Sequence, residues 1–107
     1  MPTHERRRRP RVTVLGSLYG RLVALDVPVS VRNISLSGMS IETEIPFPIG
    51  TSHAFEILLG DETVVRVAGE IIHCNRVEED ADDRYVSGIR FTDEEPENVA
   101  TLMKQIT

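Results

Sequence analysis

The sequence predicts a small antiparallel β-barrel that carries one helix at its C-terminal end. Short runs that alternate apolar and polar residues recur along most of the chain, and stretches rich in Gly, Pro and Asp separate them. Only the C-terminal segment has the three-and-four spacing of an amphipathic helix. A chain of 107 residues can bury a core of its own, so we expect a single folded domain.

The expected strands share alternation and enrichment in β-branched residues. They cover residues 12–25, 29–32, 39–42, 51–59, 63–76 and 84–91. The first is long, and its two glycines, Gly16 and Gly20, predict that it bends. The connections carry turn residues and fall at 26–28, 35–38, 46–50, 60–62 and 78–83. The last of these is acidic and predicts a solvated hairpin loop.

The C-terminal segment predicts a helix over residues 96–106. Val99, Leu102, Met103 and Ile106 fall on one helical face, and Pro96 suits the first helical position. Residues 93–95 are acidic, which the positive end of the helix dipole favours. We expect this helix to pack on one opening of the barrel.

Charge is unevenly distributed along the chain. Residues 4–11 hold five arginines and one glutamate, a charge of +4, so the formal net charge of −5 leaves −9 (−5 minus +4) for the remainder. An acidic body is unfavourable for duplex DNA, which is bound through many phosphate contacts. A cationic arm on such a body favours a compact anionic ligand.

The basic residues of the arm are all arginine, and Lys104 is the one lysine of the chain. A guanidinium fork donates two parallel hydrogen bonds to the O6 and N7 atoms of guanine or to two phosphate oxygens, whereas lysine offers a point charge. The use of arginine instead of lysine indicates that the arm recognises a defined planar or anionic group.

No arrangement of residues in the sequence marks a catalytic or metal site. The histidines and Cys74 lack paired ligand spacing, and no serine lies in a nucleophile motif. We therefore expect no enzyme, no metal and no cofactor. The sequence has no signal-peptide pattern and no apolar run long enough for a membrane span, and one thiol fits a reducing compartment, so we expect a cytoplasmic protein.

Two motifs, in this order, resemble those of the PilZ domain family. Arg7 and Arg11 have the Arg-x-x-x-Arg spacing of the first motif, and Asn33, Ser35 and Gly38 match the second, Asp/Asn-x-Ser-x-x-Gly. Residues 69–72 and 85–93 are similar to later strands of the family. The resemblance implies a six-stranded barrel with a C-terminal helix, and a bacterial receptor for the second messenger cyclic di-GMP. It divides the chain into an arm, residues 1–11, and a barrel domain, residues 12–107.

The resemblance also implies roles for the arginines. Arg7 and Arg11 clamp guanine and phosphate, and Arg6 is the extra arginine of family members that bind a stacked pair of ligand molecules. Arg8 has a competing spacing to Arg11, so the register of the clamp stays open. The arm has almost nothing apolar to bury, and we expect it to become ordered on binding.

The second motif and one histidine complete the expected site. Asn33 can pair with a guanine edge, Ser35 offers a hydroxyl, and Gly38 permits a positive φ and a close approach of the backbone. His73 lies where family members often carry an aromatic residue that stacks on guanine. Two alternatives stay open: Asn33 and Ser35 can simply bond their own turn, and His73 can be an ordinary residue on a sheet surface.

Three functions are compatible with the sequence. The leading hypothesis is a cyclic di-GMP receptor whose arm becomes ordered on binding and which signals to an unidentified protein effector. The alternative is a PilZ-like adaptor that contacts proteins and binds no nucleotide, although such adaptors usually lack the arginines. A third class binds a nucleic-acid polymer or an anionic membrane through the arm, and the acidic body disfavours it.

Overall fold

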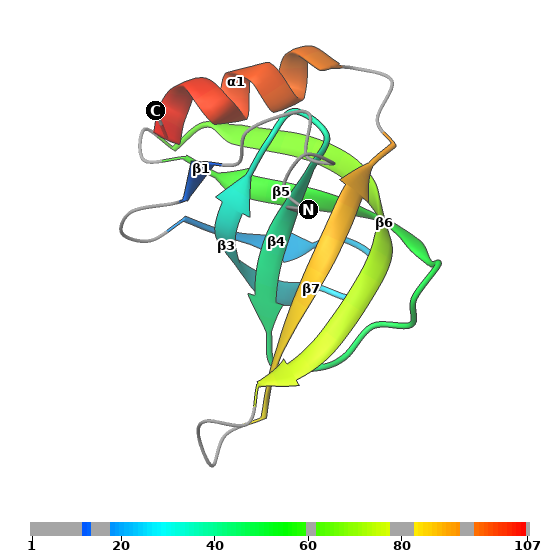
Figure 1. The fold of residues 1–107 in the computed structure, drawn as a ribbon. Helices are drawn as coiled ribbons and strands as arrows, with labels where there is room; N and C mark the ends of the chain where they lie inside the picture. The colour runs from blue at the N-terminus through cyan, green and yellow to red at the C-terminus, as the bar shows by residue number, and fades with distance from the viewer. Residues whose placement is uncertain (1–11, 14–17, 60–61, 78–82, 93–95, 107) are drawn as a thin grey trace.

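The computed structural model describes residues 12–13, 18–59, 62–77, 83–92 and 96–106, which form seven strands and one helix (Figure 1). The strands are β1 (Val12–Thr13), β2 (Tyr19–Leu22), β3 (Val27–Ile34), β4 (Gly38–Thr43), β5 (Ser52–Leu58), β6 (Val64–Val77) and β7 (Arg84–Phe91). The helix α1 spans Pro96–Ile106.

Six of the described strands close into an antiparallel barrel. Hydrogen-bonded neighbours follow the order β3, β2, β5, β6, β7 and β4, and β4 pairs back with β3. The short strand β1 pairs with the end of β3, beyond the part that β2 covers. Closure leaves no long unpaired edge in these six strands, so their backbone groups are satisfied within the sheet.

The core lies inside the barrel because each strand alternates inward and outward side chains. On β3, for example, Val29 and Val31 are buried while Pro28 and Arg32 are exposed. The largest fully buried apolar side chains come from β2 to β7 and the helix, and burying each one contributes roughly 1.5–3 kcal/mol. They are Leu22, Ile34, Met39, Ile41, Phe55, Ile57, Val67, Ile71, Ile89 and Leu102.

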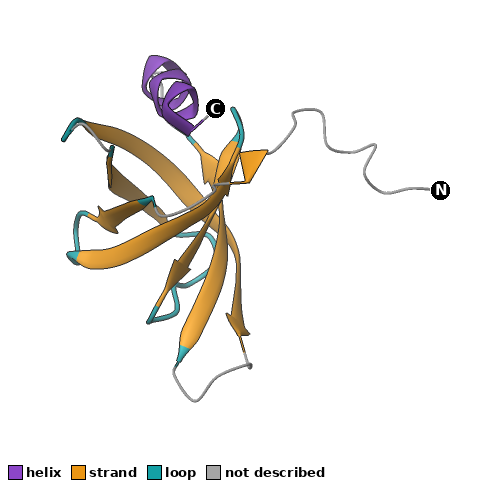
Figure 2. Cartoon of the chain, turned by 90° about the vertical axis from the view of Figure 1, so that its left-hand side faces the viewer, coloured by secondary structure: helices purple, strands orange, loops and turns teal. Residues whose placement is uncertain are grey.

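The helix covers one opening of the barrel, as Figures 1 and 2 show. Val99 and Leu102 are almost fully buried, and the Asn98 side chain donates a hydrogen bond of 2.8 Å to the carbonyl of Arg66 on β6. The loop between β3 and β4 lies at the same end of the barrel (Figure 1). Among the described residues, no helix has the length and apolar content that crossing a bilayer requires.

The predicted barrel and helix are confirmed, and β7 and α1 have the bounds expected from the sequence. The acidic segment joins two strands whose ends, Val77 and Arg84, face each other, which confirms the hairpin; residues 78–82 themselves lie outside the described part. The acidic residues 93–95 before the helix also lie outside it.

The strand predicted over residues 12–25 ends earlier than expected. Its described parts are β1 and β2, and residues 14–17, where a bend at Gly16 was predicted, lie outside the described residues. β2 ends at Leu22 because residues 23–26 form the turn into β3. Asp26 adopts a φ of 54°, and its carboxylate accepts a hydrogen bond from Arg21 on β2. The turn therefore comes earlier than the predicted one, and Val27 and Pro28 already belong to β3.

Candidate functional site

The loop between β3 and β4 is held by its own serines. The Ser35 amide donates to the Gly38 carbonyl at 2.8 Å, and the Ser37 amide donates to Ser35 Oγ at 3.2 Å. Ser35 Oγ also lies 3.1 Å from Ser37 Oγ and donates to the Gly38 carbonyl at 3.4 Å. Because Ser35 is only 1% exposed, its hydroxyl serves this turn, which is the local alternative left open by the sequence.

Gly38 is required by crowding, and the expected positive φ is wrong. Within the described chain, Gly50 is the glycine with a positive φ. A β-carbon on Gly38 would overlap the backbone carbonyl of Ile89, since β4 and β7 approach closely here. Gly38 therefore lets the loop end sit against β7, and the Ser37 carbonyl accepts a hydrogen bond of 2.9 Å from the Phe91 amide.

A β-bulge turns two adjacent polar residues of β3 outward. Val31 pairs with Ile41 and Asn33 pairs with Ser40, so Arg32 is an extra residue opposite the same stretch of β4. Val31 and Ile34 remain buried, whereas Arg32 is exposed and Asn33 half-buried. Asn33 is thus placed on the outer surface of the barrel, directly beside the serine-held loop.

Strand register aligns Asn33 with His73, which is far away in sequence. Asn33 pairs with Ser40 on β4, Ser40 pairs with Gly88 on β7, and Gly88 pairs with His73 on β6. We call these four residues the loop row. Neighbouring strands lie about 4.8 Å apart, so the loop row spans about 14 Å from Asn33 to His73. The structure therefore brings both predicted residues to one face.

The imidazole of His73 lies flat over Gly88. A β-carbon on Gly88 would overlap His73 Nε2 and lie 2.7 and 2.9 Å from Cδ2 and Cε1. An atom beyond the ring edge at this distance from Nε2 would lie farther from both carbons, so the short distances place the added atom over the face of the ring. A second bulge, between Ile71 and His73, turns His73 outward, and the residue is exposed. Its other ring face is therefore accessible from outside the barrel.

The chain segment that follows the arginines runs beside the same row. On β1, Val12 pairs with Ile34 and Thr13 pairs with Asn33. Arg6, Arg7 and Arg11 lie outside the described residues, but Arg11 is bonded directly to Val12. The arm is therefore attached to the barrel at the row that carries Asn33, on the side opposite to Ser40.

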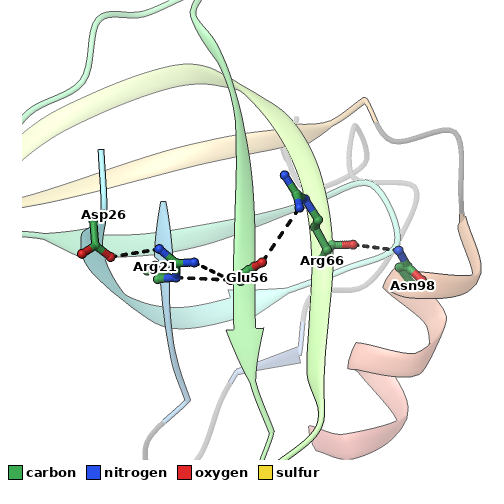
Figure 3. A network of polar contacts seen from close by, with 5 residues as sticks. All are labelled: Arg21, Asp26, Glu56, Arg66 and Asn98. Carbon is green, nitrogen blue, oxygen red and sulfur yellow. Dashed lines mark hydrogen bonds and ion pairs between the residues drawn. The ribbon is translucent and has the colours of Figure 1, made fainter. Parts of the chain in front are cut away.

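A different outward row, formed by Arg21, Glu56 and Arg66, consists of paired charges (Figure 3). We call it the paired row. Arg21 donates to Asp26 at 3.0 Å and to Glu56 at 3.0 Å, and Arg66 lies 3.9 Å from Glu56. The hydrogen bond to Asp26, followed by that to Glu56, raises the pKa of Arg21 above its ordinary value. Asp26 and Glu56 therefore occupy these two guanidinium groups with ion pairs inside the protein.

A cleft of about 570 Å³ lies at the other end of β3 and β4. Its walls come from the starts of β2 and β3, the end of β4 and Arg84, which is bound to Glu42 at 2.6 Å. None of the described residues predicted to bind ligand lines this cleft. Among the described residues, no cluster of His, Cys, Asp or Glu is arranged to hold a metal ion.

The sequence reasoning missed Arg32, Ser40 and Gly88. One signal was available for the first, because two adjacent polar residues between Val31 and Ile34 interrupt the alternation that a regular strand requires. Ser40 and Gly88 enter the row through register alone, which no local pattern encodes.

The family model of the PilZ domain matches residues 5–107. The fold is similar to the PilZ domain with c-di-GMP of YcgR from Escherichia coli, with a TM-score of 0.74 and 20% identity over 94% of this chain and 88% of that one.

Two longer proteins share the fold. The K. pneumonia MrkH-c-di-GMP complex has a TM-score of 0.72 at 13% identity, covering 92% of this chain and 51% of that one. The Bacillus subtilis inhibitor of motility (MotI/DgrA) has a TM-score of 0.73 at 16% identity, covering 99% and 54%. The chain thus spans about half the length of each. No curated protein matches the chain by sequence.

Proposed function

The chain belongs to the PilZ domain family, and from that premise we propose that it is a receptor for cyclic di-GMP. The arm, residues 1–11, closes over ligand held on the loop row of the barrel, residues 12–107. Ordering of the arm then changes the surface that a protein effector meets. In this proposal the domain acts in the bacterial cytoplasm as a receptor and adaptor without catalytic activity.

The observation that carries the proposal is the pairing of Thr13 with Asn33. The attachment point of the arm limits where its arginines can reach, since each residue extends the chain by at most about 3.6 Å. Here the arm joins the strand that flanks the motif, and His73 lies on the far side of the same row. The attachment point of the arm, Asn33 and His73 therefore border one stretch of outer surface.

Within this site, the arginines supply the charged contacts. Arg7 and Arg11 donate paired hydrogen bonds to a guanine edge and to phosphate, a geometry that suits the guanidinium fork. Arg6 contacts a second ligand molecule where two molecules stack. The free energy for ordering the arm comes from these contacts, since the ligand binds the closed state better than the open one.

The barrel residues have distinct roles in the proposed complex. Asn33 offers an amide to a guanine edge, and His73 offers the outer face of a ring that Gly88 supports from below. Ser35 and Gly38 act by shaping the loop, because the Ser35 hydroxyl is buried in the turn and Gly38 lies against β7.

Calorimetric titration of the whole chain with cyclic di-GMP tests the proposal. We expect saturable binding with one or two ligand molecules per chain, and much weaker binding of cyclic di-AMP, because adenine lacks the O6 acceptor of guanine. GMP serves as a further control, since it offers one guanine and cannot bridge the row. Absence of binding by cyclic di-GMP would overturn the proposal and favour an adaptor that contacts proteins alone.

A further inference from the structure

One exposed arginine that neither motif contains lies at the bulge of β3. Arg32 is the extra residue opposite Ser40, and it projects from the outer surface next to Asn33. Val31 on one side is buried and faces the core, so the bulge gives Arg32 and Asn33 a common outward direction. A guanidinium on a barrel strand therefore lies directly beside the loop row.

Arg32 differs from the other arginines of the described chain in its electrostatic surroundings. Arg21, Arg66, Arg76, Arg84 and Arg90 each form an ion pair with an aspartate or a glutamate. Arg32 forms neither an ion pair nor a side-chain hydrogen bond with any described residue. Its five N–H donors are thus free of protein partners within the described part.

The position of this guanidinium matters because the rest of the barrel is acidic. Residues 12–107 lie in the part of the chain that carries the charge of −9, and a strongly acidic surface repels an anion. An arginine without a carboxylate partner contributes its full positive charge at the point where the anion is held. Using a paired arginine there would first require breaking its ion pair.

We propose that Arg32 is a further ligand-binding residue, which donates hydrogen bonds to a phosphate of the cyclic dinucleotide from the barrel side. This inference rests on the proposed function. Arg32 and the loop row would then hold the ligand together on the outer surface of the barrel. Because Arg32 is fixed on a strand, its contact does not depend on ordering of the arm.

The test compares Arg32→Ala with Arg66→Ala by calorimetric titration with cyclic di-GMP. Both variants remove one exposed positive charge, but Arg66 belongs to the paired row. A charge-assisted hydrogen bond predicts that Arg32→Ala weakens binding about tenfold or more, and we expect less than about a twofold change for Arg66→Ala. Arg32→Gln, which keeps donors and loses the charge, should fall between wild type and Arg32→Ala.

Salt dependence separates a contact to phosphate from a structural role. Added salt screens charge–charge contacts, so the affinity difference between wild type and Arg32→Ala should shrink as NaCl is raised. Thermal unfolding should be nearly unchanged in Arg32→Ala, since the side chain has no described partner to lose.

The outcomes separate the inference from the function on which it rests. Wild-type protein that does not bind cyclic di-GMP refutes the proposed function. Wild-type protein that binds, together with unchanged affinity in Arg32→Ala or an equal loss in Arg66→Ala, refutes the role of Arg32 alone.

Discussion

The paired row and the loop row lie on the same barrel and are built by the same strand alternation, yet they use polar side chains in opposite ways. In the paired row, Glu56 bridges Arg21 and Arg66, so these charges are satisfied within the surface (Figure 3). Beside the loop row, Arg32 has no ion pair among the described residues, and His73 presents an open ring face. In a surface that supports the fold, the polar side chains bind one another. In a surface suited to a ligand, some donors and ring faces stay available.

The largest effect on binding is expected from replacing the arm arginines that would close over the loop row. We expect Arg7→Ala or Arg11→Ala to weaken cyclic di-GMP binding by roughly 1.5–3 kcal/mol, the range for charged hydrogen bonds. Calorimetric titration measures the loss, with Arg66→Ala as the matched charge control. Wild-type affinity in both arm variants would disprove the assignment of the clamp.

A smaller effect is expected at the other end of the loop row. His73→Ala should weaken binding by about 1–2 kcal/mol, because stacking of a base on an aromatic ring contributes about 1–3 kcal/mol. His73→Phe keeps a ring and should retain most of the affinity. Gly88→Ala keeps the imidazole of His73, but the added β-carbon pushes the ring away from β7. This variant should therefore also weaken binding. Unchanged affinity in His73→Ala would identify His73 as an ordinary surface residue.

The layer beneath the loop row provides a test of stability without a change in binding. Ser87 pairs with Ile41 and Cys74, and its hydroxyl is fully buried without a hydrogen-bond partner among the described residues. Leaving a buried hydroxyl unsatisfied costs about 1–3 kcal/mol, so Ser87→Ala should raise the free energy of unfolding by about 1 kcal/mol. Urea denaturation measures this change. A decrease would show that the hydroxyl has a partner in solution.

The smallest effect is expected in the paired row. Glu56→Gln removes the charge that bridges Arg21 and Arg66, and exposed pairs of this kind typically contribute 0.2–1 kcal/mol. We expect a slight decrease in unfolding temperature that is smaller at high salt. Cyclic di-GMP affinity should stay within about twofold of wild type. A larger loss of affinity would show that the paired row and the loop row are coupled.

The sequence was sufficient for the strands, the helix and the motif loop, because each depends on local periodicity or turn chemistry. The bounds of the strand at residues 84–91 and of the helix at residues 96–106 were predicted as observed. The strand predicted over residues 12–25 was given the wrong end, because glycines and aliphatic residues do not show where a strand stops and a turn begins. The register of the strands could not be predicted from local patterns. The pairing of Asn33 with Ser40, and that of Gly88 with His73, is set by how whole strands align in the barrel.

The predicted site was recovered in part for the same reason. Motif spacing identified Asn33 and the loop, but it gave Ser35 and Gly38 an external role that their packing does not support. Arg32 was missed although Arg32 and Asn33 interrupt the alternation between Val31 and Ile34, because this signal does not show what lies opposite the two residues. The pairing of Asn33 with Ser40 identifies the interruption as a bulge.

The two bulges separate the folding of this barrel from its capacity for recognition. Each adds one residue to a strand without altering the buried residues on either side of it, Val31 and Ile34 in β3 and Ile71 in β6. A chain that lacked one residue at either place would keep the same buried positions and regain strict alternation, with one outward side chain fewer on that strand. The number of residues between buried positions therefore determines how many side chains each of these two strands adds to the outer surface of the barrel.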